Sequence, residues 1–208
     1  TNGCIDSTTI TLTDPDLLIP NGSVTSNYVG QQISCVGASD GEITAVVTGG
    51  TTTYTYAIDT LGVGVISPFQ ASPFSGLPAG SYIIYYLDAH GCDTSEIITL
   101  TDPDSLSGTL SIIDSVSCNG VADGSIRFIV DGINTGTPGY TYSINGGPFQ
   151  LDSTFTGLLG GQSHIITVQD TNGCQYTDSV FLSDPTEIVF AATSLVFFPN
   201  FGVSCEAA

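Results

Sequence analysis

Apolar and polar residues alternate with a period of two in several short runs of the sequence. In residues 124–130, Ile126, Phe128 and Val130 fall on one face of an extended segment, and Arg127 falls on the other. Successive side chains of a β-strand point to opposite faces, so this pattern predicts a half-buried strand. Further strands are predicted at residues 54–58, 82–87, 95–100, 140–144, 165–169 and 177–182.

Turn residues separate these runs, and no run shows the 3.6-residue period of a helix. Asn145, Gly146 and Gly147 follow one predicted strand and favour a tight hairpin turn. Short strands between turn signals are typical of a β-sandwich with six or seven strands. We therefore expect an all-β fold with an immunoglobulin-like, Greek-key topology.

Three landmarks recur along the chain with a period of about 85 residues. They are a Ser-Cys pair at Cys35, Cys118 and Cys205, a Gly-Cys pair at Cys4, Cys92 and Cys174, and an Asp-Pro pair at Asp14, Asp102 and Asp184. Proline interrupts strand pairing, so the Asp-Pro pairs are the natural domain boundaries. The sequence thus predicts tandem repeats.

These boundaries divide the chain into four parts. Residues 1–16 are expected to close a preceding repeat, 17–103 and 104–185 to form two complete β-sandwich repeats, and 186–208 to open a following one. The last part contains the most apolar runs, Ile188–Phe190 and Leu195–Phe198, which water would disfavour. We expect the chain to be a segment of a longer array.

Each complete repeat has one cysteine near its start and one near its end. This regular spacing predicts an intradomain disulfide in each repeat, Cys35–Cys92 and Cys118–Cys174. Cys4 and Cys205 would then bond partners outside this chain. Metal ligation is the alternative, but the sequence has no Cys-x-x-Cys pair and no Cys/His cluster. Disulfides in turn predict an oxidising, extracellular location.

Composition narrows the function further. The chain has 20 acidic residues against a single basic one, Arg127, and a formal net charge of −19. Nucleic acids and anionic membranes attract lysine and arginine, so neither is an expected partner. The sequence has 41% hydrophobic residues, enough for packed cores, but no apolar run long enough to cross a bilayer.

The recurring segments resemble the SprB-type repeat. The resemblance rests on Cys118–Gly120, Asp123–Ile126, Pro138–Ser143 and Asp170–Cys174, and in the first repeat on Gly49–Thr51, Tyr54–Tyr56 and Leu77–Tyr82. Such repeats occur in tandem in very large secreted surface proteins of the Bacteroidota, including the mobile adhesin of gliding cells. The resemblance implies cell-surface display, cell adhesion and no enzymatic activity.

Few residues could support catalysis. The two histidines, His90 and His164, are each replaced by another residue type at the matching position of the other repeat. With one arginine and no lysine, little could stabilise an oxyanion or bind a phosphate. We therefore expect no enzyme and no required cofactor.

Carboxylates gather at the predicted joints. Asp14 and Asp16 flank one proline, and Asp102 and Asp104 flank another. Clustered carboxylates suit calcium, so a calcium ion at the joints is one hypothesis. The alternative is that each aspartate caps a turn through its own backbone. The same choice applies to the aspartates in Gly-flanked turns, namely Asp40, Asp88, Asp123 and Asp170.

An Asp-Ser or Asp-Thr pair followed by an aliphatic residue or threonine recurs along the chain. It resembles the O-glycosylation sequon of the Bacteroidota. The hydroxyl residues that would carry the glycan are Ser7, Thr60, Ser105, Ser115, Ser153 and Ser179. The alternative is that Asp-Ser pairs are simply common in turns.

The sequence therefore predicts a non-catalytic array of repeats in a large cell-surface protein, forming a disulfide-stapled stalk or filament. Its expected partners are neighbouring repeats of the same chain and other copies in a filament. The alternative is a binding module for extracellular glycans or surfaces. In that case exposed aromatic rings, such as Tyr54, Phe69, Phe149 and Phe198, would form the binding platform.

Overall fold

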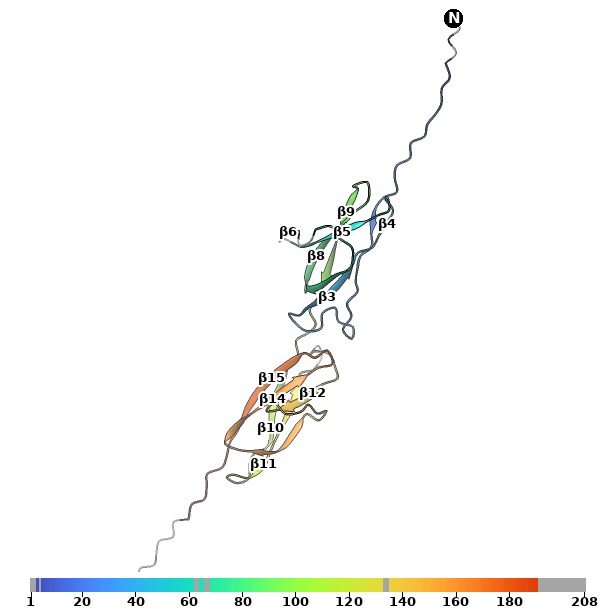
Figure 1. Ribbon diagram of the computed structural model, residues 1–208. Helices are drawn as coiled ribbons and strands as arrows, with labels where there is room; N and C mark the ends of the chain where they lie inside the picture. The colour runs from blue at the N-terminus through green and yellow to red at the C-terminus, as the bar shows by residue number, and fades with distance from the viewer. Residues whose placement is uncertain (1–2, 4, 62–63, 66–67, 133–134, 191–208) are drawn as a thin grey trace, which may run out of the picture.

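The computed structural model describes residues 3, 5–61, 64–65, 68–132 and 135–190. Within these residues the chain forms fifteen strands and no helix, in two groups that lie end to end (Figure 1). We call β1 to β9 the first domain and β10 to β15 the second domain. The expected all-β fold is confirmed.

The first domain contains two facing sheets of three and four strands and a separate two-stranded pair. Their orders are β2-β3-β7, β6-β5-β8-β9 and β1-β4. The strands are β1 (Ile19–Pro20), β2 (Ser23–Val24), β3 (Ser39–Thr44), β4 (Val47–Thr48), β5 (Thr55–Thr60), β6 (Gly64–Val65), β7 (Phe74–Pro78), β8 (Gly80–Leu87) and β9 (Asp93–Leu100).

The second domain repeats this plan with two three-stranded sheets, β10-β11-β13 and β12-β14-β15. Its strands are β10 (Gly108–Asp114), β11 (Ala122–Val130), β12 (Thr141–Ile144), β13 (Thr154–Leu159), β14 (Gln162–Gln169) and β15 (Gln175–Leu182). All of the strand pairs in both domains are antiparallel. By position in the sheets, β8 and β9 of the first domain correspond to β14 and β15 of the second.

Each domain has its own buried cluster between its two sheets. In the first domain Ile43 of β3 and Phe74 of β7 pack with Ile84 of β8. In the second domain Phe128 of β11 packs with Ile166 and further residues of the opposite sheet. Because each core is drawn from both sheets of one domain, each domain is a sandwich.

The side chains of β11 alternate between buried and exposed, as the sequence pattern predicted. Ile126 and Phe128 are buried on one face of β11, while Arg127 is exposed on the other. The predicted turn also forms, because Gly147 N donates to Ile144 O at 2.9 Å. After this turn the chain pairs with β12 only through an isolated bridge between Tyr142 and Gln150, so the hairpin is short.

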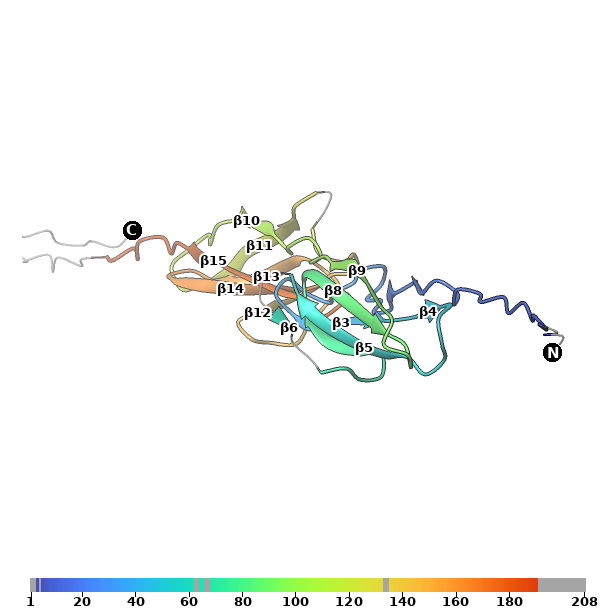
Figure 2. The ribbon, with the colours of Figure 1, turned by 90° about the horizontal axis from the view of Figure 1, so that it is seen from above.

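The chain enters and leaves the pair of domains at opposite ends (Figures 1 and 2). One short linker connects β9 to β10 at the joint between the domains. The structure therefore presents one internal joint and two outer ends, and the joint is where the two repeats meet.

Candidate functional site: the joint between the two domains

A disulfide bond crosses the joint. It links Cys35, in the loop before β3, to Cys174, in the turn before β15, with the two Cα atoms 5.5 Å apart. Cys92 and Cys118 are free and exposed. The predicted intradomain bonds Cys35–Cys92 and Cys118–Cys174 are therefore wrong: the disulfide links neighbouring domains.

Strand direction explains why the early and late cysteines of one domain cannot meet. The Cys35 loop is held beside the end of β9, because Gly37 N donates to Asp102 Oδ1 at 3.2 Å. Cys92 lies directly before β9 begins. A strand rises about 3.3 Å per residue, so the length of β9 separates the two cysteines by roughly 25 Å. A disulfide needs Cα atoms within about 7 Å.

Each domain therefore carries its two cysteines at opposite ends. The late cysteine of the second domain faces the early cysteine of the first, and these two meet at the joint. Cys4 and Cys205, which we expected to bond partners outside the chain, lie outside the described residues.

The turn that carries Cys174 is built around the carboxylate of Asp170. One oxygen, Oδ1, accepts hydrogen bonds from Asn172 N at 3.0 Å and Cys174 N at 2.9 Å. The other, Oδ2, accepts from Thr137 N at 2.8 Å. Gly173 has a φ of 88°, in the left-handed region that glycine tolerates best. These contacts fix the backbone of Cys174 where the turn leads into β15.

The loop that carries Cys35 is also closed by local hydrogen bonds. Ala38 N donates to Cys35 O at 2.9 Å, which forms a tight turn around the cysteine. Ser34 N donates to Asp40 Oδ1 at 3.1 Å and ties the loop to the start of β3. Both halves of the disulfide thus sit in loops shaped by their own domain.

Polar contacts accompany the disulfide across the joint. Asn172 Nδ2 donates to Tyr28 O in the first domain at 3.1 Å and to Thr137 Oγ1 in its own domain at 2.9 Å. The sulfur of Cys174 lies 3.1 Å from Ser34 O. The two domains therefore meet through a bonded, specific contact and not through the linker alone.

The linker itself is anchored at both ends. Thr101 N donates to Gln32 Oε1 at 2.8 Å, which holds its start against the first domain. Pro103 is buried, and Leu106 packs into the core of the second domain. Only a few residues separate these anchors, so the linker adds little freedom to the joint.

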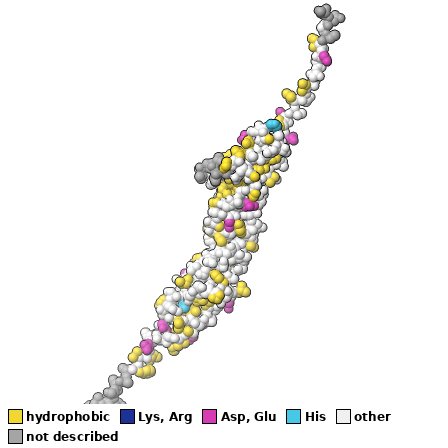
Figure 3. Space-filling view, viewed as in Figure 1, with side chains coloured by type: hydrophobic (Ala, Val, Ile, Leu, Met, Phe, Trp, Pro, Cys, Tyr) yellow, Lys and Arg dark blue, Asp and Glu magenta, His cyan; other side chains and the backbone are white. Residues whose placement is uncertain are grey.

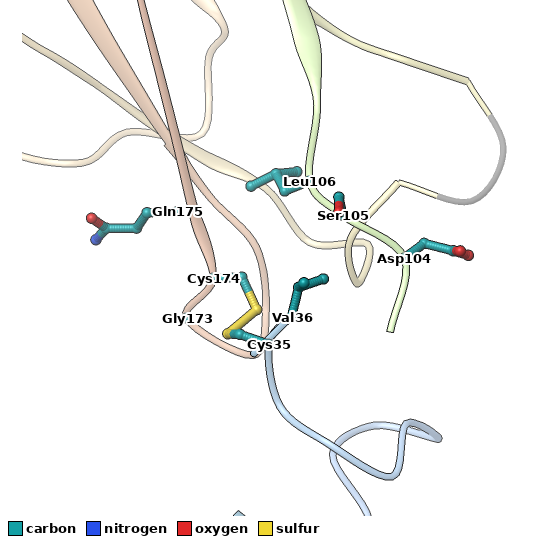
Figure 4. A pocket seen from close by; sticks show the side chains of 8 residues that line it. All are labelled: Cys35, Val36, Asp104, Ser105, Leu106, Gly173, Cys174 and Gln175. Carbon is teal, nitrogen blue, oxygen red and sulfur yellow. A yellow bond between two sulfur atoms is a disulfide. The ribbon is translucent and has the colours of Figure 1, made fainter. Parts of the chain in front are cut away.

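A hollow of about 470 Å³ lies beside the disulfide (Figure 4). It is lined by Cys35, Val36, Asp104, Ser105, Leu106, Gly173, Cys174 and Gln175. In Figure 4 the side chain of Asp104 points away from the disulfide. The lining combines the bonded cysteines with the linker, so the hollow belongs to the joint itself.

The predicted calcium ligands do not gather into a cage. Asp102 accepts a hydrogen bond from Gly37 N, in the distant Cys35 loop, and not from the backbone of its own turn. Asp14, Asp16 and Asp104 are exposed. Among the described residues, no group of three or more Asp, Glu, His or Cys side chains could hold a metal. In Figure 3 the acidic side chains are scattered over both domains. Calcium binding at the joints stays a prediction.

The aspartates in Gly-flanked turns also act as caps. Asp88 and Asp170 each accept hydrogen bonds from three backbone amides, and Asp40 and Asp123 each accept one. The recurrence of these residues was visible in the sequence. The sequence did not indicate the partners of these aspartates that lie far away along the chain, such as Thr51 for Asp88 and Thr137 for Asp170.

The predicted glycosylation residues differ in exposure. Ser7, Ser105, Ser115 and Ser179 are exposed, whereas Thr60 and Ser153 are half-buried. Thr60 ends β5 directly after a buried aspartate, Asp59. Glycosylation stays a prediction, and the four exposed serines are the accessible acceptors.

Both histidines have structural partners. His90 Nδ1 lies 2.7 Å from Thr51 Oγ1, and the buried His164 places Nε2 2.9 Å from Leu159 O. The first contact joins an imidazole to a side-chain hydroxyl, and the second joins an imidazole to a backbone carbonyl. The histidines are accounted for by the turns and strands that hold them.

The aromatic residues proposed for binding are divided between the core and the surface. Tyr54 packs against the first core, and its hydroxyl donates to Gly49 O at 2.7 Å. Phe69 and Phe149 are about half exposed and precede the corresponding glutamines, Gln70 and Gln150, that bridge to β5 and β12. Phe198 lies outside the described residues.

The family comparison agrees with the resemblance noted in the sequence. Residues 27–63 and 110–149 match the model of the SprB repeat, one region in each domain. Each matched region includes the early cysteine of its domain. No curated protein matches the chain. Among the described residues, no helix is long and apolar enough to span a membrane.

Solved structures resemble the chain only distantly. Three N-terminal domains of the bacteriophage RB49 Highly Immunogenic Outer Capsid protein (Hoc) match with a TM-score of 0.43 and 14% identity, over 80% of this chain and 59% of that one. The fibronectin(III)-like modules of Clostridium thermocellum CbhA give 0.31 and 14%, over 79% and 94%. A two-domain fibronectin type-III segment of chicken tenascin gives 0.32 and 9%, over 81% and 99%.

Proposed function

We propose that this chain is a non-catalytic, structural and adhesive segment of a large cell-surface protein. In this proposal its SprB repeats are immunoglobulin-like, Greek-key sandwiches of about 85 residues. They are joined end to end into a disulfide-linked stalk or filament outside the cell. The observation that carries the proposal is the bond between Cys35 and Cys174, which connects successive domains.

A stalk must transmit force without coming apart. The Cys35–Cys174 bond provides a covalent path that bypasses the chain between the two cysteines, which are 139 positions apart in the sequence. Most of both sandwiches lie within that span, from β3 to β14. A load applied to the two ends of the chain would therefore cross the joint through sulfur, and the strands from β3 to β14 would lie outside the load path.

Surface chemistry supports the same role. SprB repeats belong to surface-associated proteins, and disulfides persist in oxidising surroundings. The charged residues are almost all acidic, and the formal net charge is −19. Neighbouring stalks would therefore repel one another. Glycans on the exposed serines would add to this separation.

Single-molecule force spectroscopy tests the load path. We expect the oxidised chain, pulled by its two ends, to extend without the loop that the disulfide closes, whose ends are 139 positions apart in the sequence. Reduction should add roughly 500 Å of contour length, at up to about 3.6 Å per residue. Cys35→Ser should behave like the reduced chain in both conditions. Equal contour lengths for the oxidised and reduced chain would contradict the proposal, and antibody labelling of intact native cells tests the surface location.

A binding module is the second candidate, and Phe69 and Phe149 favour it. These half-exposed rings lie at corresponding positions in the two domains, so an array would present them at regular intervals. If they bind glycans or surfaces, Phe69→Ala with Phe149→Ala should reduce retention on the target without changing the unfolding midpoint. Unchanged retention would leave the stalk as the whole function.

A further inference from the structure

The two free cysteines lie at the two outer ends of the pair of domains. Cys92 is in the turn before β9, as Cys174 is in the turn before β15, and Cys118 is in the loop before β11, as Cys35 is in the loop before β3. Each outer end thus presents one half of the bonded joint.

The Cys92 turn has the geometry of the bonded Cys174 turn. Asp88 Oδ1 accepts from His90 N at 2.9 Å and Cys92 N at 2.8 Å, and Oδ2 accepts from Thr51 N at 2.9 Å. Asp170 makes the same three contacts in the second domain. The Cys92 turn therefore has the conformation of the disulfide-bonded Cys174 turn, although Cys92 itself is not bonded.

The Cys118 loop likewise has the geometry of the bonded Cys35 loop. Val121 N donates to Cys118 O at 3.1 Å, and Ser117 N donates to Asp123 Oδ1 at 3.0 Å. The Asp-Pro aspartate caps this loop as well, because Gly120 N donates to Asp184 Oδ1 at 3.3 Å. The outer loop is therefore preorganised by its own domain.

The outer end near Cys118 has a hollow that corresponds to one side of the hollow at the joint. A hollow of about 320 Å³ is lined by Ser117, Cys118, Asn119, Pro185, Thr186, Glu187 and Ile188. These residues match the early-cysteine and linker walls of the joint hollow. The wall that is absent is the one supplied at the joint by Gly173, Cys174 and Gln175 of the next domain.

An apolar residue that follows each Asp-Pro pair indicates that a domain of the same repeat would dock at the outer end. Leu18, Leu106 and Ile188 each lie three residues after the proline of such a pair. Leu18 and Leu106 are 7% and 8% exposed in the cores of their domains, whereas Ile188 is 80% exposed. In both described domains an apolar side chain at this position packs into the domain that follows the Asp-Pro pair, and Ile188 offers the same side chain on the surface.

We infer that each outer end is a docking site for another domain of this same repeat, sealed by a disulfide. Cys118 bonds the late cysteine of the domain that docks after it, and Cys92 bonds the early cysteine of the domain that docks before it. Between two copies of this chain, Cys118 of one copy therefore bonds Cys92 of the next, in head-to-tail order. This inference rests on the proposed stalk, whose repeats it connects.

The bond forms by exchange with a small-molecule disulfide, such as oxidised glutathione. The Cys118 thiol loses its proton, and its sulfur attacks the glutathione disulfide and releases one glutathione thiolate. The Cys92 thiolate then attacks the Cys118 sulfur of the mixed disulfide and releases the second. Two protein thiols become one disulfide, while one glutathione disulfide becomes two glutathione thiols.

One contact of the internal joint is missing at this outer joint. Val24 and Ile112 occupy corresponding positions, opposite Ile43 and Ile126, but five fewer residues separate Ile112 from Cys118 than separate Val24 from Cys35. The shorter loop lacks the segment around Tyr28, whose carbonyl accepts from Asn172 at the internal joint. The outer joint therefore relies on the disulfide and on the two preformed loops.

The test uses the full 208-residue chain with Cys4→Ser and Cys205→Ser. One form also carries Cys92→Ser and another carries Cys118→Ser, so that each retains a single free cysteine. In a glutathione redox buffer we expect each form alone to stay monomeric and the mixture to form a Cys118–Cys92 dimer. The mixed dimer should exceed either homodimer by about tenfold or more, a preference of about 1.4 kcal/mol.

Random pairing of exposed thiols would give homodimers in both separate samples, and it would overturn the inference. A mixture that stays monomeric while the Cys35–Cys174 bond is intact would also overturn it, without affecting the proposed stalk. As a matched control, Ser179→Cys is placed in the Cys92→Ser form. Its new thiol is exposed on β15, away from the turn, and should not cross-link to Cys118.

Discussion

Asp170 Oδ2 accepts a hydrogen bond from Thr137 N at 2.8 Å, in a part of the second domain that is shielded from water. The same carboxylate holds Asn172 N and Cys174 N through its other oxygen. One side chain thus shapes the turn that carries the disulfide across the joint.

Removal of this carboxylate should weaken the second domain. Asp170→Ala leaves three amide hydrogens without their acceptor, and hydrogen bonds to a charged group contribute about 1.5–3 kcal/mol each before water compensates for part of the loss. We expect the free energy of unfolding to fall by about 2–4 kcal/mol in urea titrations. Asp104→Ala, at an exposed position of the linker, is the control and should change it by less than about 0.5 kcal/mol.

Acid should weaken the first domain through Asp88. Hydrogen bonds from the backbone amides of Thr51 and Cys92 hold the pKa of this carboxyl below its ordinary value. A depressed pKa in the folded state stabilises the fold above the ordinary aspartate pKa, which is about 4. That stabilisation should disappear as the pH falls through the lower, folded pKa.

Urea midpoints measured between pH 2 and pH 7 check this expectation. Asp88→Asn should lower stability at pH 7 and flatten the acid limb of the profile. An acid limb of equal steepness in both proteins would show that other carboxyls govern it. Asp123 should make a similar contribution in the second domain, since the hydroxyl and amide of Ser117 lower its pKa as well.

Trypsin should cut the folded chain very slowly. Arg127 is the only lysine or arginine, and it lies in β11, which pairs with β10 on one side and β13 on the other. Cleavage requires that strand to leave the sheet, so the rate should follow local unfolding. Electrophoresis of samples taken over several hours checks this, and rapid cleavage in native buffer would show that β11 opens easily.

Glycans, if the sequon is used, should appear on the accessible serines. Ser105, Ser115 and Ser179 are exposed, whereas Thr60 is half-buried at the end of β5. We expect peptide mass spectrometry of protein from its native host to find hexose on the serines and an unmodified Thr60. Bare masses at all six sequons would exclude the modification in that host.

The strands could be predicted from the sequence, whereas the cysteine pairing could not. Alternation such as that of Ile126, Arg127 and Phe128 depends only on neighbouring residues in a half-buried strand. It can therefore be recognised without knowledge of the tertiary structure. The pairing of Cys35 depends on which end of a sandwich each loop reaches, and that follows from the directions of all the strands. One signal was available: Cys92 precedes an eight-residue strand that ends at the linker.

The hydrogen-bond partners of the turn-capping aspartates could not be predicted from the sequence either. Asp170 was recognisable as a recurring turn residue, but nothing near it in the sequence indicates Thr137 as its partner. The contact from Asn172 to Tyr28 depends on a loop that is longer in the first domain than in the second, so the repeat pattern could not predict it. Contacts between domains are specific to each joint, whereas strands are common to all repeats.

Tryptic digestion of a Cys118→Ser chain tests the central claim most directly. The chain also carries Cys4→Ser and Cys205→Ser, and its free thiols are alkylated before it is unfolded and cut at Arg127. Cys35 and Cys174 then lie on different fragments, whereas Cys35 and Cys92 lie on the same one. We predict that the two fragments stay joined on a non-reducing gel and separate on reduction. Fragments that separate without reduction would contradict a disulfide between the domains.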